Sequence, residues 1–361
     1  MIDDAALPEE SPSATMNYLK PRGLLYHYTD VEGFLGILDS DSLYATHIRY
    51  LNDSREFIDA LEHAEGLTDA LVDEFDRCKA ELRRSLASAG EPFSGKFEEL
   101  RTDLKAGLKE FLSSISPRVA GRFGAYVVSF TDDSAQEPAS GGNPGDRLSQ
   151  WRAYCGAGRG ISLGFDFEAL HGKEPGKSWV LDGCVAYLVN CIYDAESKRA
   201  NLKTVADLVI PSVRKFWETG SIPEYCEEHE SSFAAFRQQT LLVWIMSAST
   251  FKDPAFAEEK EWRVVILGRG DKGPMSSKGA PDMAVKFRNG PLGITPYLHF
   301  PLRLSSPSSP LRRIVIGPTP HMQESIKAVE MILEDRGMTL RSEEHPDGIE
   351  VFSSLIPYRD W

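Results

Sequence analysis

The order of strand-like and helix-like segments along the chain constrains its fold more than any other feature. Apolar and β-branched runs such as residues 124–131 (GAYVVSFT) and 184–193 (CVAYLVNCIY) have strand character. These runs occur in groups separated by helical stretches, and they do not alternate one by one with helices. A doubly wound parallel sheet requires that alternation, so the pattern predicts an α+β fold with a mixed or antiparallel sheet.

Local signals place the first elements. Residues 23–30 (GLLYHYTD) predict a buried strand, and Asp30 can cap a helix over residues 31–40. Residues 42–51 (SLYATHIRYL) predict a second extended segment. The later predicted elements are strands at 259–267, 283–288, 297–304, 312–319 and 348–359, with a helix at 321–337 that ends at a glycine.

The chain divides into two parts by composition. Residues 1–22 are polar with three prolines and predict a flexible N-terminal segment. Residues 23–361 predict a single α+β domain with helical insertions at about 68–116 and 196–252. No Gly-x-Gly-x-x-Gly follows a predicted strand, which disfavours a Rossmann dinucleotide site.

Charge and cysteine usage limit the environment. A net charge of −14 opposes binding to bulk nucleic acid, which depends on Lys and Arg. The five cysteines form no Cys-x-x-Cys pair, as is typical of a reducing compartment. The N-terminus has no apolar signal region, and the longest uncharged stretch is too short to span a bilayer. We therefore expect a cytoplasmic protein without a membrane partner.

Several phrases resemble the bacterial DUF2971 family. They include LYHYTDVEGFLGIL, SLYATHIRYLND, VVSFT, LSQWRAYCGAGRGISLGFD and FAEEKEWRVVI, and later ITPYLHFPL, RIVIGP and SLIPYR. Together they extend from about residue 24 to residue 359. The order in which the phrases occur supports the resemblance to the family as much as any single phrase does. The family name implies no activity.

The opening phrase also resembles, more distantly, the start of ADP-ribosyltransferase folds. That resemblance implies an ADP-ribosyltransferase-like sheet core and a histidine on the first strand that holds the NAD ribose, which is His27 here. It implies a hydroxyl or aromatic residue on a middle element, for which the chain offers Ser129 and Thr131, or Ser149 and Tyr154. It implies a glutamate on a later strand, which is Glu261.

The chemistry of that superfamily explains these residue types. Cleavage of the nicotinamide–ribose bond develops positive charge on the ribose, and a carboxylate placed beside it stabilises the transition state. Strand alternation predicts that Glu259, Glu261 and Arg263 share one face, and a buried set of this kind would be costly without a use. The alternative is a solvent-exposed edge-strand face on which a glutamate pairs with Arg263.

Each remaining candidate has a structural alternative. His27 can be a core histidine with its hydrogen bonds satisfied, Thr29 can be a helix cap, and Trp151 can be a core residue. Arg49 and Asn52 can contact a ligand near His27 or belong to a helix cap, and Arg152 can pair with a pyrophosphate. The residues expected at the cofactor are His27, Tyr28, Thr29, Arg49, Asn52, Ser129, Ser149, Trp151, Arg152, Tyr154 and Arg263, with Glu261 and His27 as the catalytic pair.

We therefore expect an NAD-dependent ADP-ribosyltransferase or an NAD glycohydrolase, with NAD as its substrate and no metal. The superfamily resemblance implies a bacterial toxin or an antiviral defence effector. The acceptor of the ADP-ribose group can be a protein, a nucleic acid, a small molecule or water. The sequence is also compatible with an oligomer. A non-catalytic nucleotide-sensing module is the alternative. A metal-dependent nuclease, suggested by Glu258-x-Lys260, is less favoured because of the acidic charge.

Overall fold

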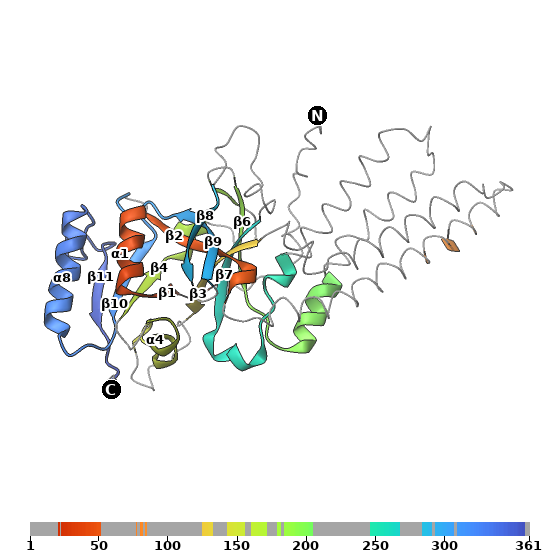
Figure 1. The fold of residues 1–361 in the computed structure, drawn as a ribbon, viewed down its shortest axis with the longest axis horizontal. Helices are drawn as coiled ribbons and strands as arrows, with labels where there is room; N and C mark the ends of the chain where they lie inside the picture. Colours follow the sequence, from red (N-terminus) through yellow and green to blue (C-terminus); the bar gives the residue numbers. More distant parts are fainter. Residues whose placement is uncertain are drawn as a thin grey trace, which may run out of the picture.

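In a computed structural model of the protein, the described residues form one sheet of 11 strands with helices on both of its faces (Figure 1). It describes residue 21, four positions between 77 and 84, and the ranges 23–51, 125–132, 143–155, 160–171, 179–181, 184–204, 246–267, 284–290, 293–306 and 309–357. The strands are β1 (Leu25–Asp30), β2 (Ser42–His47), β3 (Ala125–Asp132), β4 (Gly160–Phe165), β5 (Trp179–Leu181), β6 (Cys184–Asn190), β7 (Glu261–Leu267), β8 (Lys286–Gly290), β9 (Gly293–Pro301), β10 (Leu311–Ile316) and β11 (Glu350–Ser353). The helices are α1 (Val31–Ser40), α4 (Leu148–Tyr154), α5 (Phe167–His171) and α8 (Met322–Asp335), with 3-10 turns η2 (Ile48–Tyr50) and η4 (Pro254–Glu259).

The sheet is antiparallel apart from one parallel pair. Its main path runs β11-β10-β4-β1-β3-β2-β9-β8, and β7 joins β3 to β6 and β5. Of the strand pairs in the described residues, β10 with β11 alone is parallel, and α8 makes the crossover between these two strands. The predicted α+β class with a mostly antiparallel sheet is therefore confirmed.

The central strand β3 has two neighbours along one edge. Its other edge pairs with β7 over the whole length from Ala125 to Thr131. On the first edge, β1 pairs at Tyr26↔Thr131, whereas β2 pairs near the opposite end of β3, at Thr46↔Val127. Among the described strands, residues 128–130 thus have no partner on this edge. We call this place, where β1 and β2 diverge from β3, the split.

The larger core lies on the face of the sheet that α1 and α8 cover (Figure 1). Phe34, Ile37 and Leu38 of α1 pack with strand residues such as Leu163. Asp30 caps α1 as predicted, since its side chain accepts a hydrogen bond from the Gly33 amide at 2.7 Å. The spacing of apolar residues in the sequence therefore predicts both the position of α1 and the face of it that is buried.

The opposite face of the sheet carries α4. Trp151 is fully buried against Tyr28, with 4.9 Å between ring centroids, which confirms the core alternative for this tryptophan. Its indole Nε1 donates to Asp146 at 2.8 Å, and Asp146 also accepts from the Leu355 amide after β11 at 2.7 Å. Asp146 thereby ties α4 to the C-terminal segment.

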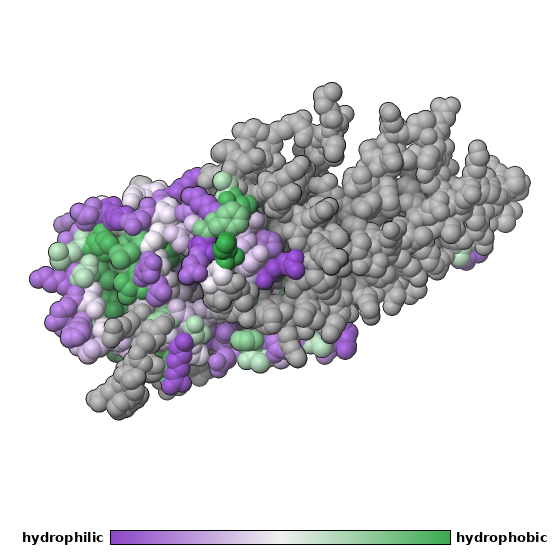
Figure 2. Space-filling model, in the orientation of Figure 1, coloured by the Kyte–Doolittle hydropathy of each residue, from purple (hydrophilic) through white to green (hydrophobic). Residues whose placement is uncertain are grey.

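The C-terminal ends of the two larger helices meet at the protein surface. Arg336, just after α8, donates to the Leu38 carbonyl at 2.9 Å and forms an ion pair with Asp39. Figure 2 shows hydrophobic surface in the region that Figure 1 assigns to α1 and α8. Val31, Leu35 and Met331 on these helices are exposed.

Several predicted boundaries change. The second extended segment ends at His47, because residues 48–50 form a 3-10 turn. Glu259 lies in η4 and not in the strand, and Lys260 between them has a left-handed φ of 44°. The predicted strand therefore begins at Glu261, and the alternation expected from Glu259 to Arg263 holds for Glu261 and Arg263 but not for Glu259.

The predicted insertions are described only in part. Four positions between 77 and 84 are helical, as are residues 195–204 and 246–248. The rest of both insertions and most of residues 1–22 lie outside the described residues. No helix in the described ranges is both long enough and apolar enough to cross a bilayer.

Candidate functional site

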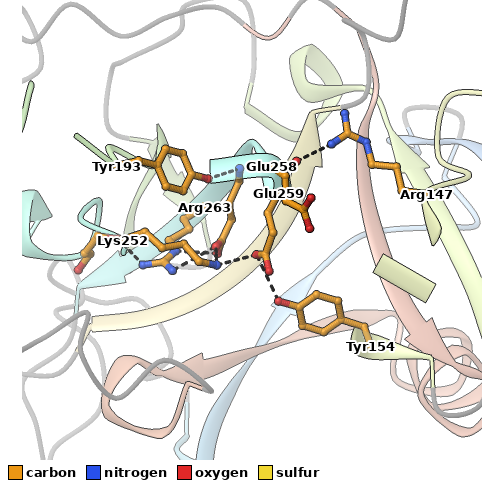
Figure 3. A network of polar contacts seen from close by, with 9 residues as sticks. Arg147, Tyr154, Tyr193, Lys252, Glu258, Glu259 and Arg263 are labelled. Atoms are coloured by element: carbon orange, nitrogen blue, oxygen red, sulfur yellow. Dashed lines mark hydrogen bonds and ion pairs between the residues drawn. The ribbon is translucent and has the colours of Figure 1, made fainter. Parts of the chain in front are cut away.

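Four charged side chains meet at the start of β7, and we call them the charge cluster. Glu261 and Arg263 come from β7, Glu259 from the end of η4, and Lys252 from the segment before η4 (Figure 3). Residue burial is nearly complete, with exposed fractions of 4% for Glu261 and 1% for Arg263. The cluster holds two positive and two negative charges.

Glu261 is the centre of this cluster. Its Oε1 accepts from Arg263 Nε at 2.7 Å, and its Oε2 accepts from Arg263 Nη2 at 3.2 Å. Lys252 Nζ forms a further ion pair with Glu261 Oε2, and it reaches Glu259 Oε2 at 2.7 Å. Both carboxylate oxygens of Glu261 are therefore engaged by cations.

Neighbouring polar groups complete the cluster. The Glu261 amide donates to the Tyr193 hydroxyl at 2.8 Å, and Arg263 Nη1 donates to the Ser249 carbonyl at 2.9 Å. From α4, the Tyr154 hydroxyl lies 3.4 Å from Glu259 Oε2 (Figure 3). Separate segments of the chain thus supply hydrogen bonds to one buried network.

The electrostatics fix the protonation states. Burial opposes ionisation of Glu261, but the charges of Arg263 and Lys252 outweigh it and lower the pKa of this carboxyl to about 2. Burial also opposes the charged form of Lys252, yet the carboxylates of Glu261 and Glu259 hold its pKa above the ordinary value. Burial raises the pKa of the Tyr154 hydroxyl. Glu261 and Lys252 therefore stay ionised around neutral pH.

The charge cluster stabilises its surroundings as a paired unit. Removing one partner from a buried ion pair leaves an uncompensated charge in a low-dielectric environment, which is strongly destabilising. The solvent-exposed alternative for Glu261 is wrong, because the side chain is buried, although its pairing with Arg263 was correctly anticipated. In this arrangement no carboxylate oxygen of Glu261 is left without a cation.

His27 occupies the split between β1 and β2. Its Nδ1 lies 2.9 Å from the Ser129 carbonyl oxygen, at the part of β3 where neither strand pairs. The half-buried ring packs edge-on against Phe130, with 6.0 Å between ring centroids. Burial, and to a lesser extent the charge of Arg288, lower the pKa of His27, so the imidazole is neutral at pH 7.

The hydrogen bond to Ser129 also selects the tautomer. A carbonyl oxygen can only accept, so the neutral ring carries its proton on Nδ1. Nε2 then presents a lone pair, and it makes no hydrogen bond with any residue in the described ranges. His27 can therefore accept a hydrogen bond from a ligand hydroxyl at Nε2.

His27 and Glu261 do not meet. Tyr26, Thr131 and Glu261 lie side by side across β1, β3 and β7, whereas His27 follows Tyr26 and starts from the opposite face of β1. Ser129 and Arg263 are paired in register, so Ser129 links the two places through its carbonyl on one side and its strand pairing on the other. A joint catalytic role of His27 and Glu261 stays a prediction.

The other predicted residues divide into packing and surface positions. Tyr28 is buried, and its hydroxyl accepts from the Arg147 amide at 3.2 Å. Thr29 packs beside the first turn of α1, where a Cβ at Gly33 would lie 2.0 Å from its Oγ1. Ser149 is half-buried on α4.

The arginines predicted to contact the ligand do not lie together in the charge cluster. Arg49 and Arg152 are exposed, on η2 and α4 respectively. Asn52 lies outside the described residues. Neither exposed arginine belongs to the charge cluster as the described contacts define it.

Lys252 and Tyr193 belong to the network but were not predicted from the sequence. Lys252 precedes Glu259 by seven residues and Glu261 by nine, and no local periodicity connects it with either. Tyr193 approaches from the end of β6, 68 residues before Glu261. A buried Glu-x-Arg pair with an extra carboxylate nearby could have indicated that a second cation was needed, but not which one.

A protein-family model matches part of the chain. Residues 150–264 match the model of DUF2971, described as a protein of unknown function. No curated protein and no solved structure matches the chain. The matched range begins in α4 and ends in β7, so it contains the whole charge cluster and does not contain His27. This match supports the DUF2971 resemblance of the chain over residues 150–264.

Proposed function

We propose that the protein binds NAD at the split and cleaves its nicotinamide–ribose bond, as an ADP-ribosyltransferase or an NAD glycohydrolase. The observation that carries the proposal is the ring of His27, which stands in the split with Nδ1 held by the Ser129 carbonyl. A fixed, neutral imidazole with a lone pair on Nε2 suits a ribose hydroxyl, which can donate to it.

The placement of His27 also explains why binding there could promote cleavage. Holding the ribose through its hydroxyl orients the glycosidic bond, and orientation lowers the barrier when the bound geometry resembles the transition state. Nicotinamide leaves as a neutral molecule and needs little acid assistance. We assign His27 the role of accepting a hydrogen bond from a ribose hydroxyl at Nε2.

The role of Glu261 in this proposal is narrower than the sequence implied. Its carboxylate is ionised, as a group that stabilises a ribose cation must be, but two cations already neutralise it. A neutralised carboxylate offers little further attraction to a developing positive charge. We therefore propose Glu261 as a positioning residue that fixes the start of β7 beside β3.

The test measures nicotinamide released from NAD by the wild type and by His27→Ala. We expect release by the wild type and a loss of at least a hundredfold in His27→Ala, because the ribose is no longer oriented. His321→Ala, which removes an exposed histidine beside α8, is the matched control and should release nicotinamide like the wild type. Circular dichroism of each variant checks its fold.

A second function is favoured by one specific observation. Both oxygens of Glu261 are occupied by cations, so this carboxylate is not available to stabilise a ribose cation, and a nucleotide can bind at the split without being cleaved. A nucleotide-sensing module would show a rise in melting temperature with NAD or ADP-ribose and no release of nicotinamide. That combination, with the rise lost in His27→Ala, would replace the enzymatic proposal with the binding one.

A further inference from the structure

The face of the sheet beside the split carries a basic and aromatic surface. The register of β2, β9 and β8 places Tyr44, Thr46, Tyr297, His299, Arg288 and Lys286 on the same face, which we call the basic-aromatic face. None of these six residues is acidic. These residues carry two cations and no carboxylate, whereas the chain as a whole has a net charge of −14.

Arg288 is held at the centre of this face. Its guanidinium carbon lies 5.8 Å from the Tyr44 ring centroid and 5.9 Å from that of Tyr297. The two tyrosine rings are 4.7 Å apart, so the guanidinium rests on a paired aromatic surface. An arginine supported in this way loses less side-chain freedom when it binds a ligand.

A hydrogen bond holds the guanidinium next to the place where β2 pairs with β3. Arg288 Nη2 donates to Thr46 Oγ1 at 3.0 Å, and Thr46 is paired with Val127 of β3. Val127 and Ser129 are two residues apart, a spacing of about 7 Å along a strand. The carbonyl of Ser129 is the group that holds His27. Arg288 and His27 therefore approach neighbouring positions on β3 from the two sides of the split.

The remaining chemistry of Arg288 suits an anion. Its side chain is exposed, and no carboxylate in the described ranges forms an ion pair with it. The positive charge lies near enough to His27 to add to the effect of burial in lowering the pKa of that imidazole. A planar guanidinium with free donors binds phosphate oxygens in a bidentate geometry.

We propose that Arg288, supported by Tyr44 and Tyr297, binds the pyrophosphate of a nucleoside diphosphate whose ribose lies at His27. This inference rests on the proposed function for the identity of the ligand, but the phosphate contact itself does not require catalysis. It assigns β8 and β9, which lie outside the range matched by the DUF2971 model, to ligand binding.

Calorimetric titration with ADP and with adenosine separates the phosphate contact from recognition of the nucleoside. We expect the wild type to bind ADP more tightly than adenosine, with an affinity for ADP that falls as salt is added. Arg288→Gln should weaken ADP binding at least tenfold and leave adenosine binding unchanged. Arg199→Gln, which removes an exposed arginine on the helical residues 195–204, is the matched control and should bind ADP like the wild type.

The outcomes distinguish this inference from the proposed function. If ADP binding depends on Arg288 but the wild type releases no nicotinamide, the phosphate site stands and the enzymatic proposal fails. If the wild type cleaves NAD but Arg288→Gln binds ADP unchanged, the phosphate site is wrong and the enzymatic proposal stands. Absence of ADP binding, or equal affinities for ADP and adenosine, also overturns the phosphate site.

Discussion

At the scale of single residues, the buried charges at the start of β7 are the main electrostatic feature of the described structure. Lys252, Glu259, Glu261 and Arg263 balance one another, so removing one of these charges leaves another buried charge with one partner fewer. Such a network resists substitution by residues of similar shape but different charge. The predictions at this scale therefore concern stability more than activity.

Lys252→Met should destabilise the protein by about 3–5 kcal/mol, because Glu259 would lose the cation that it contacts and Glu261 would keep only Arg263. The free energy of unfolding, measured by urea denaturation, checks this. Adding Glu261→Gln to that variant restores a balance of one positive and one negative charge. The double variant should therefore lose less stability than the sum of the two single changes.

Asp39→Asn provides the control for the previous prediction. It breaks the ion pair with Arg336, in which the Asp39 side chain is 67% exposed, and should cost less than about 1 kcal/mol. If Lys252→Met were as mild as this exposed variant, the charge cluster would not be the buried network described above.

The depressed pKa of Glu261 predicts a pH dependence of stability. The folded value is about 2 and the ordinary value is 4.5, so the ionised carboxylate contributes stability that is fully present above about pH 4.5. That contribution is lost as the pH falls through 2. The stability difference between the wild type and Glu261→Gln should therefore shrink from pH 5 to pH 2 in urea titrations, and a constant difference would contradict the assignment.

At the scale of elements, the close approach of the loop before α4 to β1 is the feature that sets α4 on the sheet. Gly145 has a φ of 83°, and a Cβ there would lie 2.4 Å from Cε1 of the buried Tyr26. Glycine is required at this position on two counts, because the backbone is left-handed and the ring leaves no space. The same loop supplies Asp146, which joins α4 to the chain after β11.

Gly145→Ala should accordingly lower the free energy of unfolding by about 2–4 kcal/mol, since it adds backbone strain and overpacking together. Gly337→Ala separates the two causes, because Gly337 has a φ of 67° but no atom of the described residues within 4 Å of the position that a Cβ would take. It should cost about 1 kcal/mol. Equal losses in the two variants would show that the contact with Tyr26 is relieved without cost.

Much of the element order follows from the sequence alone. The strand, cap and helix over residues 25–40 match their prediction because apolar spacing and the Asp30 cap are local signals. The helix before Gly337 matches for the same reason. The end of β2 at His47 and the 3-10 turn of Glu259 were not predicted, because local composition does not show where pairing with a distant strand stops.

At the scale of the whole molecule, the sheet brings together residues that are far apart in the sequence. The class of fold was predictable because strands cluster along the chain, but the pairing of β1 and β2 with different ends of β3 was not. His27 and Glu261 were both identified as important polar positions. Their separation depends on register, which a reading of motifs does not provide.

The same scale explains why Arg288 was missed. It lies in a short strand, and its aromatic support comes from Tyr44, 244 positions earlier in the chain, and from Tyr297 on the neighbouring strand. Only the order β3-β2-β9-β8 makes the three side chains neighbours. Long-range pairing of this kind decides the binding face, whereas local pattern decides the elements.

The central claim is that His27 presents the Nε2 lone pair to the ribose of a bound dinucleotide. Nitrogen NMR of the histidine side chains during a titration with NAD tests it most directly, because protonated and unprotonated ring nitrogens have distinct chemical shifts. We predict that free His27 is neutral with its proton on Nδ1, and that NAD shifts the Nε2 resonance as it accepts a hydrogen bond. A proton on Nε2 in the free protein, or a His27 spectrum that saturating NAD leaves unchanged, would contradict the account.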